Sequence, residues 1–193
     1  MYEQSKSAKR RYNNGNFHSK YFRGDGIDVG AGNDTLGHLT NQFSGIKSVR
    51  GWDMPDGDAQ YLVTIENNTF DFLHSSHCLE HMEDHGVALF NWIRVVKPGG
   101  YLVITIPEEV MYEHSHWPSK FNDDHKWSFV LGKTSKLPRS VNVLDMLSRI
   151  NNIAVVQKIE LIDEFYHENV DPDFDQTLLP NIECCIEIIL RKV

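Results

Sequence analysis

The sequence predicts an α/β fold with a doubly wound, mostly parallel sheet, and three observations support this. Short apolar runs alternate with segments of helical periodicity along most of the chain. The links between them are short, as in crossover units that place helices on both faces of a parallel sheet. A glycine-rich turn at residues 30–32 follows the first apolar run, and such turns occur at strand-to-helix junctions of this fold class.

The elements expected before residue 108 follow from these patterns. Strands are expected at residues 26–29, 46–52, 70–76 and 101–106. The third run is apolar or aromatic on both faces, which is typical of a central strand. A helix is expected over 35–43, with Asp34 or Thr35 as its N-cap. A second helix is expected over 85–96 and ends at a Lys-Pro-Gly-Gly turn.

The alternation changes after residue 107. Residues 108–139 are rich in His, Trp, Asp and Lys, and we expect them to form an insertion over the carboxyl ends of the strands, where substrate-selecting loops lie. A helix over 141–150 follows. The last two strands, at 154–162 and 182–190, are expected to pair as an antiparallel hairpin at the sheet edge, so that one domain spans residues 1–193.

Charge and composition limit the class of partner. The chain has 193 residues and a net charge of -8, so no overall attraction draws it to nucleic acid or to an anionic membrane. No apolar run approaches the roughly 18 residues of a transmembrane helix, and the amino terminus lacks the apolar core of a signal peptide. We expect a cytoplasmic protein with a small-molecule substrate. The oligomeric state stays open.

The first 23 residues form a basic arm on this acidic chain. Its cations are Lys6, Lys9, Arg10, Arg11, Lys20 and Arg23, against the single acid Glu3. The arm is either a solvated terminus or a segment that closes over an anionic substrate. The cysteines, Cys78, Cys184 and Cys185, are an odd number and two are adjacent, so we expect reduced, structural thiols.

The glycine turn and the acids after it suggest a nucleotide-like ligand. Gly30 and Gly32 lack a Cβ atom, so the backbone can turn sharply and approach a ligand. Asp53 follows the second strand, where a carboxylate can accept hydrogen bonds from ribose hydroxyls, and Asp58 can accept from an adenine amino group. Either acid can instead cap a loop turn.

Several motifs occur together, in order and spacing, between residues 26 and 107. They are IDVGAG at 27–32, Asp53, GDA at 57–59, FDFLHSSHCLEH at 70–81 and VVKPGGYL at 95–102. Together they resemble the class I S-adenosylmethionine-dependent methyltransferases, of the small-molecule type often called type 11. The resemblance implies a Rossmann-like methyltransferase fold and S-adenosyl-L-methionine as cofactor. The implied cofactor-binding residues are Asp28, Gly30, Ala31, Gly32, Asp53, Met54, Asp58, Ala59, Ser75 and Ser76.

The chain departs from the family pattern at two places. Asp34 stands where the glycine turn usually has its third glycine, which affects how closely that part of the loop approaches the cofactor. Only four residues separate Asp53 from Asp58, where the family places a helix and a strand. We therefore expect a sheet shortened after its second strand.

Histidines are the candidate catalytic residues, because methyl transfer to oxygen needs a base while the cofactor supplies an activated methyl group. His77 follows the central strand, beside the expected methyl position, and His81 lies four residues further on. His114 and His116 of the insertion are further candidates. The alternative for each is a packing or loop-stabilising role.

The insertion also raises the question of a metal ion. His114, His116 and His125 lie near Asp123 and Asp124 in sequence, but no established ligand spacing is present, so no metal is assigned. The alternatives to metal binding are substrate recognition or base catalysis, and hydrogen-bonded loop structure.

The sequence thus predicts methyl transfer to a hydroxyl of a small polar metabolite, such as a sugar or a phosphorylated or nucleotide-linked precursor. One alternative is N-methylation of a small amine. Another is a non-catalytic cofactor-binding module that regulates a partner through the acidic loop at 163–175. A nicotinamide oxidoreductase fits less well, because the third glycine is missing and the later motifs differ.

Overall fold

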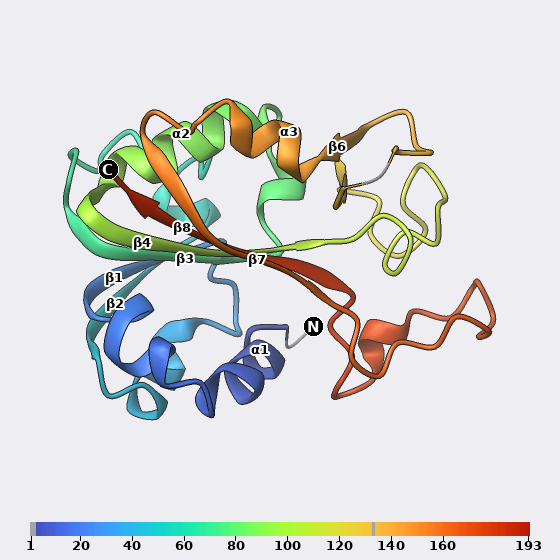
Figure 1. Ribbon diagram of the computed structural model, residues 1–193, viewed down its shortest axis with the longest axis horizontal. Coiled ribbons are helices and arrows are strands. Elements are labelled where there is room, and N and C mark those ends of the chain that lie inside the picture. Colours follow the sequence, from blue (N-terminus) through green and yellow to red (C-terminus); the bar gives the residue numbers. More distant parts are fainter. Residues whose placement is uncertain (1–2, 133) are drawn as a thin grey trace.

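A six-stranded sheet separates two layers of helices (Figure 1). The order of its strands is β2-β1-β3-β4-β8-β7. The computed structural model describes residues 3–132 and 134–193, so Met1, Tyr2 and Lys133, which fall in the expected arm and insertion, lie outside the described residues. The sheet strands are β1 (Gly24–Val29), β2 (Ile46–Trp52), β3 (Phe70–Ser76), β4 (Val96–Pro107), β7 (Ala154–Ile162) and β8 (Cys185–Lys192). A small second sheet pairs β5 (Ser128–Val130) with β6 (Ser140–Asn142).

The strand directions confirm the expected fold class. Strands β2, β1, β3 and β4 are parallel, while β8 runs antiparallel between β4 and β7. The expected hairpin of the last two strands is therefore present. Residues 53–69 contain a single short helical turn and no strand, so β2 is the sheet edge and the expected shortening is also confirmed.

Helices cover both faces of the sheet (Figure 1). One layer holds α2 (His85–Val95) and α3 (Val143–Ser148), and the other holds α1 (Glu3–Tyr12) with two irregular helical turns. Helix α2 begins where Asp84 caps the backbone nitrogens of Gly86 and Val87. It buries Leu89, Trp92 and Ile93 against the sheet, and these residues belong to the largest of the apolar clusters.

Two expected helices differ in the structure. The segment after the glycine turn is a 3₁₀ helix over Leu36–Gln42, in which Thr35 acts as the cap. The helix expected at 141–150 is shorter, because its first residues belong to β6 and pair with β5.

Within the described residues, no helix has the length and apolar character to cross a membrane. All three cysteines are buried and free, as expected.

The amino-terminal arm is part of the folded domain. Arg10 and Arg11 of α1 form ion pairs with Glu187 of β8, at 3.0 and 2.8 Å. Arg11 is wholly buried, and a buried guanidinium needs such a partner to offset its lost hydration. The Lys6 ammonium is likewise bonded to Glu3 and to backbone carbonyls. Much of the arm's positive charge is therefore neutralised inside the protein.

Candidate functional site

A cavity of about 220 Å³ opens where the glycine turn, the end of β3 and the start of α1 meet. The turn contributes residues 30–34, and β3 and the residues after it contribute Ser76, His77 and His81. Helix α1 adds Glu3 and Gln4, and the insertion adds Tyr112, Asn122 and His125. The expected insertion thus covers the carboxyl ends of the strands, where ligands bind in open α/β sheets.

The glycine turn needs its glycines for two different reasons. Gly30 has a φ of +75°, and a Cβ atom there would lie 2.6 Å from the Cβ of Cys78, so only glycine fits. Gly32 has a φ of +51° but open space around it. Its backbone nitrogen donates to Oδ2 of Asp53 at 2.7 Å. The turn is therefore fixed at two points. Gly30 packs against Cys78, in the segment after β3, and Gly32 is hydrogen-bonded to Asp53.

Asp28 at the end of β1 organises the chain around this turn. Its Oδ2 atom accepts hydrogen bonds from Oγ1 of Thr35 and from the nitrogen of Leu36, at 2.8 and 2.7 Å. Its Oδ1 atom lies 2.6 Å from Nδ1 of His74 on the neighbouring strand β3. One buried carboxylate thus links two strands to the helix that follows the turn.

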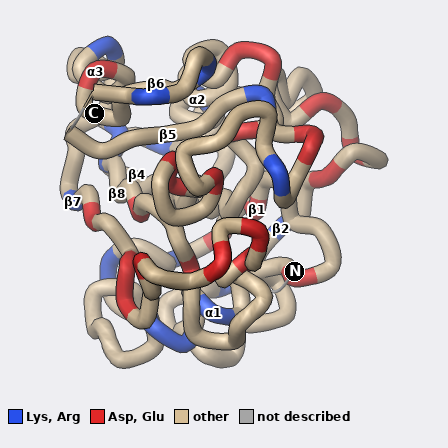
Figure 2. Tube along the Cα trace, turned by 90° about the vertical axis from the view of Figure 1, so that its right-hand side faces the viewer, with Lys and Arg blue, Asp and Glu red and all other residues tan. Residues whose placement is uncertain are grey.

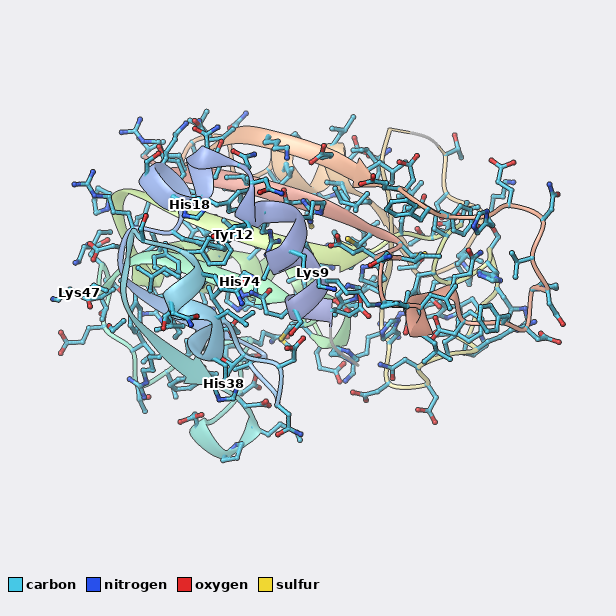
Figure 3. The ribbon with its side chains drawn as sticks, turned by 90° about the horizontal axis from the view of Figure 1, so that it is seen from below. Lys9, Tyr12, His18, His38, Lys47 and His74 are labelled. Atoms are coloured by element: carbon cyan, nitrogen blue, oxygen red, sulfur yellow. The ribbon has the colours of Figure 1, made fainter. Side chains whose placement is uncertain are left out.

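The same network continues into α1. Nη1 of Arg11 lies 3.2 Å from Nε2 of His74. Because a guanidinium can only donate, Nε2 is the acceptor, and Nδ1 carries the proton given to Asp28. Figure 3 shows α1 crossing this face of the sheet with His74 beside it. The chain of contacts from Glu187 through Arg11 and His74 to Asp28 joins β8 to the glycine turn.

Asp34, the residue that departs from the family pattern, binds the amino-terminal helix. It accepts a hydrogen bond of 2.9 Å from the backbone nitrogen of Ser5, and a second from the Ser5 hydroxyl. Ser5 lies in the first turn of α1, where backbone N–H groups have no partner within the helix. The missing glycine is thus explained: Asp34 docks α1 onto the turn.

Half of the residues implied as cofactor-binding line the cavity and half do not. Asp28, Gly30, Ala31, Gly32 and Ser76 line it. The others, none of which lines it, are Asp53, Met54, Asp58, Ala59 and Ser75. Asp53 is nevertheless bonded to the turn through Gly32, Met54 is 89% exposed, and the Ser75 hydroxyl donates to the carbonyl of Val29. A cofactor role for all ten residues stays a prediction.

A second cluster borders the cavity through His77, His81 and His125 and is centred on Glu80. Glu80 is wholly buried, and its Oε1 atom lies 3.5 Å from Nδ1 of His77. It also lies 3.9 Å from Nε2 of His125 and 4.0 Å from Nε2 of His81. Burial would raise the pKa of Glu80, but the imidazoles outweigh it and lower the pKa. Burial would lower the pKa of His77, and Glu80 raises it instead.

Sequence reasoning missed Glu80 and also Glu113, the carboxylate that pairs with His125. Glu113 accepts from Nδ1 of His125 at 2.7 Å and is itself buried. The position of Glu80, between His77 and His81, is a signal that was available in the sequence. Glu113 has no such signal, because the loop path alone brings it to His125.

His114 and His116 lie away from this cluster. Nδ1 of His114 bonds to the carbonyl of Pro172, and the side chain lines a separate cavity with Tyr166. His116 is exposed. Of the insertion histidines considered for metal binding, His125 alone joins a group with metal-ligand separations among the described residues.

Acidic residues dominate the side of the protein shown in Figure 2. Asp and Glu gather along the loops on this side, and Lys and Arg are sparser there. The cavity itself contains Glu3, Asp28 and Asp34 and borders Glu80. Its surroundings favour neutral or cationic ligand groups over phosphate.

Comparisons with known proteins agree with this geometry. Residues 46–104 match the family model of a methyltransferase domain. No curated protein matches the chain. Among solved structures, the chain resembles a SAM-dependent methyltransferase from Archaeoglobus fulgidus, with 19% identity, a TM-score of 0.60, and coverage of 100% of this chain and 95% of that one.

Two further structures show the range of proteins with this fold. The N-methyltransferase NodS from Bradyrhizobium japonicum WM9, in complex with S-adenosyl-L-homocysteine, has 12% identity and a TM-score of 0.52, with 98% and 86% coverage of the two chains. The [4+2]-cyclase SpnF has 14% identity and a TM-score of 0.56, with 98% and 80% coverage. At these identities the likeness concerns the fold, which hosts more than one reaction.

Proposed function

We propose that this chain, a class I S-adenosylmethionine-dependent methyltransferase by its matched domain and its fold, methylates a hydroxyl of a small polar metabolite. Its cofactor is S-adenosyl-L-methionine. The observation that carries the choice of a hydroxyl is the pairing of His77 with the buried carboxylate of Glu80 at one end of the cavity. An oxygen acceptor needs such a base.

The residues around the cavity fit the methionine part of the cofactor. Gly32 lines the cavity and leaves space beside it, because a Cβ atom there would meet nothing closer than Oδ2 of Asp53 at 4.0 Å. Glu3 and Gln4 of α1 line the same cavity, and Oε2 of Glu3 and Nε2 of Gln4 have no hydrogen-bond partner among the described residues. We infer that Gln4 would donate to the cofactor carboxylate and Glu3 would accept from its ammonium group.

The volume of the cavity bears on where the ribose and adenine of the cofactor would lie. Pockets for ligands of this size usually hold about 300–1,000 Å³, so the cavity of about 220 Å³ would hold only part of the cofactor. Asp53 is bonded to Gly32 at the rim. We propose that the ribose and adenine extend past Gly32 toward Asp53 and Asp58.

The reaction would need little beyond positioning and one proton transfer. S-adenosylmethionine supplies a methyl group that its sulfonium already activates. His77 would take the hydroxyl proton as the new C–O bond forms and the methyl–sulfur bond breaks, and S-adenosylhomocysteine would leave. Glu80 would stabilise the imidazolium that forms, and because it raises the pKa of His77 it makes the ring a stronger base.

The charges around the cavity narrow the acceptor further. Arg10 and Arg11 are paired with Glu187, so these cations of the arm are not available to a phosphate group. Acidic side chains line the cavity instead. We therefore favour an unphosphorylated polyol or sugar over the phosphorylated or nucleotide-linked precursors that the sequence also allowed.

The acidic surroundings also favour a second candidate, N-methylation of a small amine. A buried carboxylate such as Glu80 can hold an ammonium group, and the likeness to NodS gives a relative in which nitrogen is the acceptor. The two candidates differ in their need for a base. An amine acceptor, once it is deprotonated, attacks the methyl group with its own lone pair. His77 would then be dispensable for methyl transfer.

The test is transfer of a labelled methyl group. The purified protein is incubated with methyl-labelled cofactor and fractions of a metabolite extract, and the labelled product is identified by mass spectrometry. A methyl ether supports the proposal, and a methylated amine supports the second candidate. Tight binding of S-adenosylhomocysteine without transfer to any fraction would favour the non-catalytic module.

A further inference from the structure

The carboxylate of Glu80 is buried without a conventional partner. Its side chain is 0% exposed, and neither of its oxygens has a hydrogen-bond partner among the described residues. The nearest imidazole nitrogen, Nδ1 of His77, is 3.5 Å away, which is long for a hydrogen bond. An isolated buried carboxylate is costly, so a charge or ligand is expected to face it.

The two other imidazoles around Glu80 are each held from behind by a carboxylate. Nδ1 of His125 lies 2.7 Å from Oε1 of Glu113, and Nδ1 of His81 lies 3.1 Å from Oδ2 of Asp124. When Nδ1 donates to such a carboxylate, Nε2 carries the lone pair. Both Nε2 atoms are turned to Glu80, at 3.9 and 4.0 Å. With both rings neutral in this tautomer, three electron-pair donors would face one another with no hydrogen between them.

This pattern is the one that protein metal sites use. Imidazoles that bind a metal through one nitrogen almost always donate the other N–H to a carboxylate or carbonyl, which fixes the tautomer and orients the ring. The candidate ligand atoms of Glu80, His81 and His125 all lie within 4.8 Å of one another. Ligand atoms around a tetrahedral ion with bonds of about 2 Å lie about 3.3 Å apart, so small side-chain rotations would close the set.

We propose that Glu80, His81 and His125 bind one divalent transition-metal ion, with Glu113 and Asp124 orienting the two imidazoles. Two imidazoles and one carboxylate suit zinc or ferrous iron, whereas magnesium and calcium prefer sites made of oxygen ligands. Three protein ligands leave at least one position open for water or substrate.

The ion would lie at the acceptor end of the cofactor cavity, because His77, His81 and His125 line that cavity. There it would bind the acceptor hydroxyl and lower its pKa. With the ion bound, Glu80 would act as a ligand and not as the counter-ion of His77, and the lowered pKa of the hydroxyl would ease the transfer of its proton. This role rests on the proposed hydroxyl methylation, while the metal site itself rests on the contacts above.

Metal binding can be measured without any methyl acceptor. The untagged full-length chain is treated with a chelator, dialysed and titrated with Zn²⁺ by calorimetry, and the bound metal is counted by elemental analysis. We expect one equivalent, and the same site loaded with Co²⁺ should show the visible absorption bands of bound cobalt. His38, which is exposed and outside the cavity, provides a matched control as His38→Ala.

Variants of the cluster assign the ligands. Glu80→Gln and His81→Ala should weaken Zn²⁺ binding by more than about 100-fold, and Glu113→Gln by about 10- to 100-fold, while His38→Ala binds as the wild type does. Circular dichroism establishes that each variant folds. His81 is partly exposed, so His81→Ala is informative even if Glu80→Gln does not fold.

Absence of binding to the wild type, or equal binding by the wild type and His81→Ala, would overturn the proposed site. One equivalent bound by a wild type that methylates an amine would keep the site and reject the hydroxyl acceptor. Full hydroxyl methylation by the chelator-treated, metal-free protein would overturn the role of the ion in activating the acceptor.

Discussion

The backbone nitrogen of Ser5, in the first turn of α1, donates a 2.9 Å hydrogen bond to Oδ2 of Asp34 in the glycine turn. This contact joins the amino-terminal helix to the loop that is expected to wrap the cofactor. It also places Glu3 and Gln4 on the cavity wall. The cavity beside the glycine turn is thus completed by Glu3 and Gln4 of α1.

Replacing Asp34 should loosen α1. Asp34→Ala removes the acceptor of both Ser5 hydrogen bonds, and loss of a helix cap costs about 1 kcal/mol. We expect a lower midpoint of denaturant unfolding and faster amide exchange in α1. Asp163→Ala, at an exposed acid of the 163–181 loop, is the control and should change neither. Unchanged exchange in α1 would show that Asp34 does not hold the helix.

Gln4 should contribute to cofactor affinity. If Nε2 of Gln4 donates to the cofactor carboxylate, Gln4→Ala loses a charge-assisted hydrogen bond of about 1.5–3 kcal/mol, or roughly 10- to 100-fold in Kd. Calorimetry with S-adenosylhomocysteine measures this. Gln157→Ala, on the exposed part of β7, should bind as the wild type does. Equal affinity of all three proteins would remove Gln4 from the site.

His77 should affect turnover more than cofactor binding. For a hydroxyl acceptor, His77→Ala removes the general base, and we expect kcat to fall about 10²- to 10⁴-fold. The Kd for S-adenosylhomocysteine should change little, because the glycine turn and α1 are untouched. His38→Ala again serves as control. A wild-type rate in the His77 variant would support the amine acceptor instead.

The ion pairs of α1 should make the fold sensitive to acid. Burial would raise the pKa of Glu187, but Arg11 and Arg10 hold it well below its usual value, and Arg10 does the same for Glu183. Their stabilisation is complete above the pKa of an unfolded glutamate. It is lost as the pH falls from there toward the folded-state pKa values.

Thermal melts between neutral pH and pH 3 test this dependence. Glu187→Gln should lose about 3–5 kcal/mol at neutral pH, because Arg11 is left buried with an uncompensated charge. Its stability should also fall less steeply with acid than that of the wild type. Parallel pH profiles for the two proteins would mean that Glu187 is not a source of the acid sensitivity.

Much of the fold followed from local patterns in the sequence. The strand at residues 70–76 was predictable from a short run rich in apolar and aromatic residues, and the glycine turn from two glycines after a strand. The missing edge strand was predictable from the short spacing between Asp53 and Asp58, since four residues cannot form a helix and a strand. These features depend on residues that are contiguous in the chain, so their periodicity and turn-forming residues can be read directly from the sequence.

The candidate site depended on contacts that no local pattern encodes. His77 and His81 were predictable because they follow a central strand, and Glu80 lies between them. His125 joins them only because the insertion folds back over the sheet, which leaves His114 and His116 elsewhere.

The basic arm shows the same division between sequence and structure. Its charge is visible in the sequence, but tertiary packing decided that Arg10 and Arg11 pair with Glu187 rather than meet solvent or substrate. The physical reason is that turns and periodicity are set by neighbouring residues, whereas loop paths and buried ion pairs are set by the free energy of packing distant segments together.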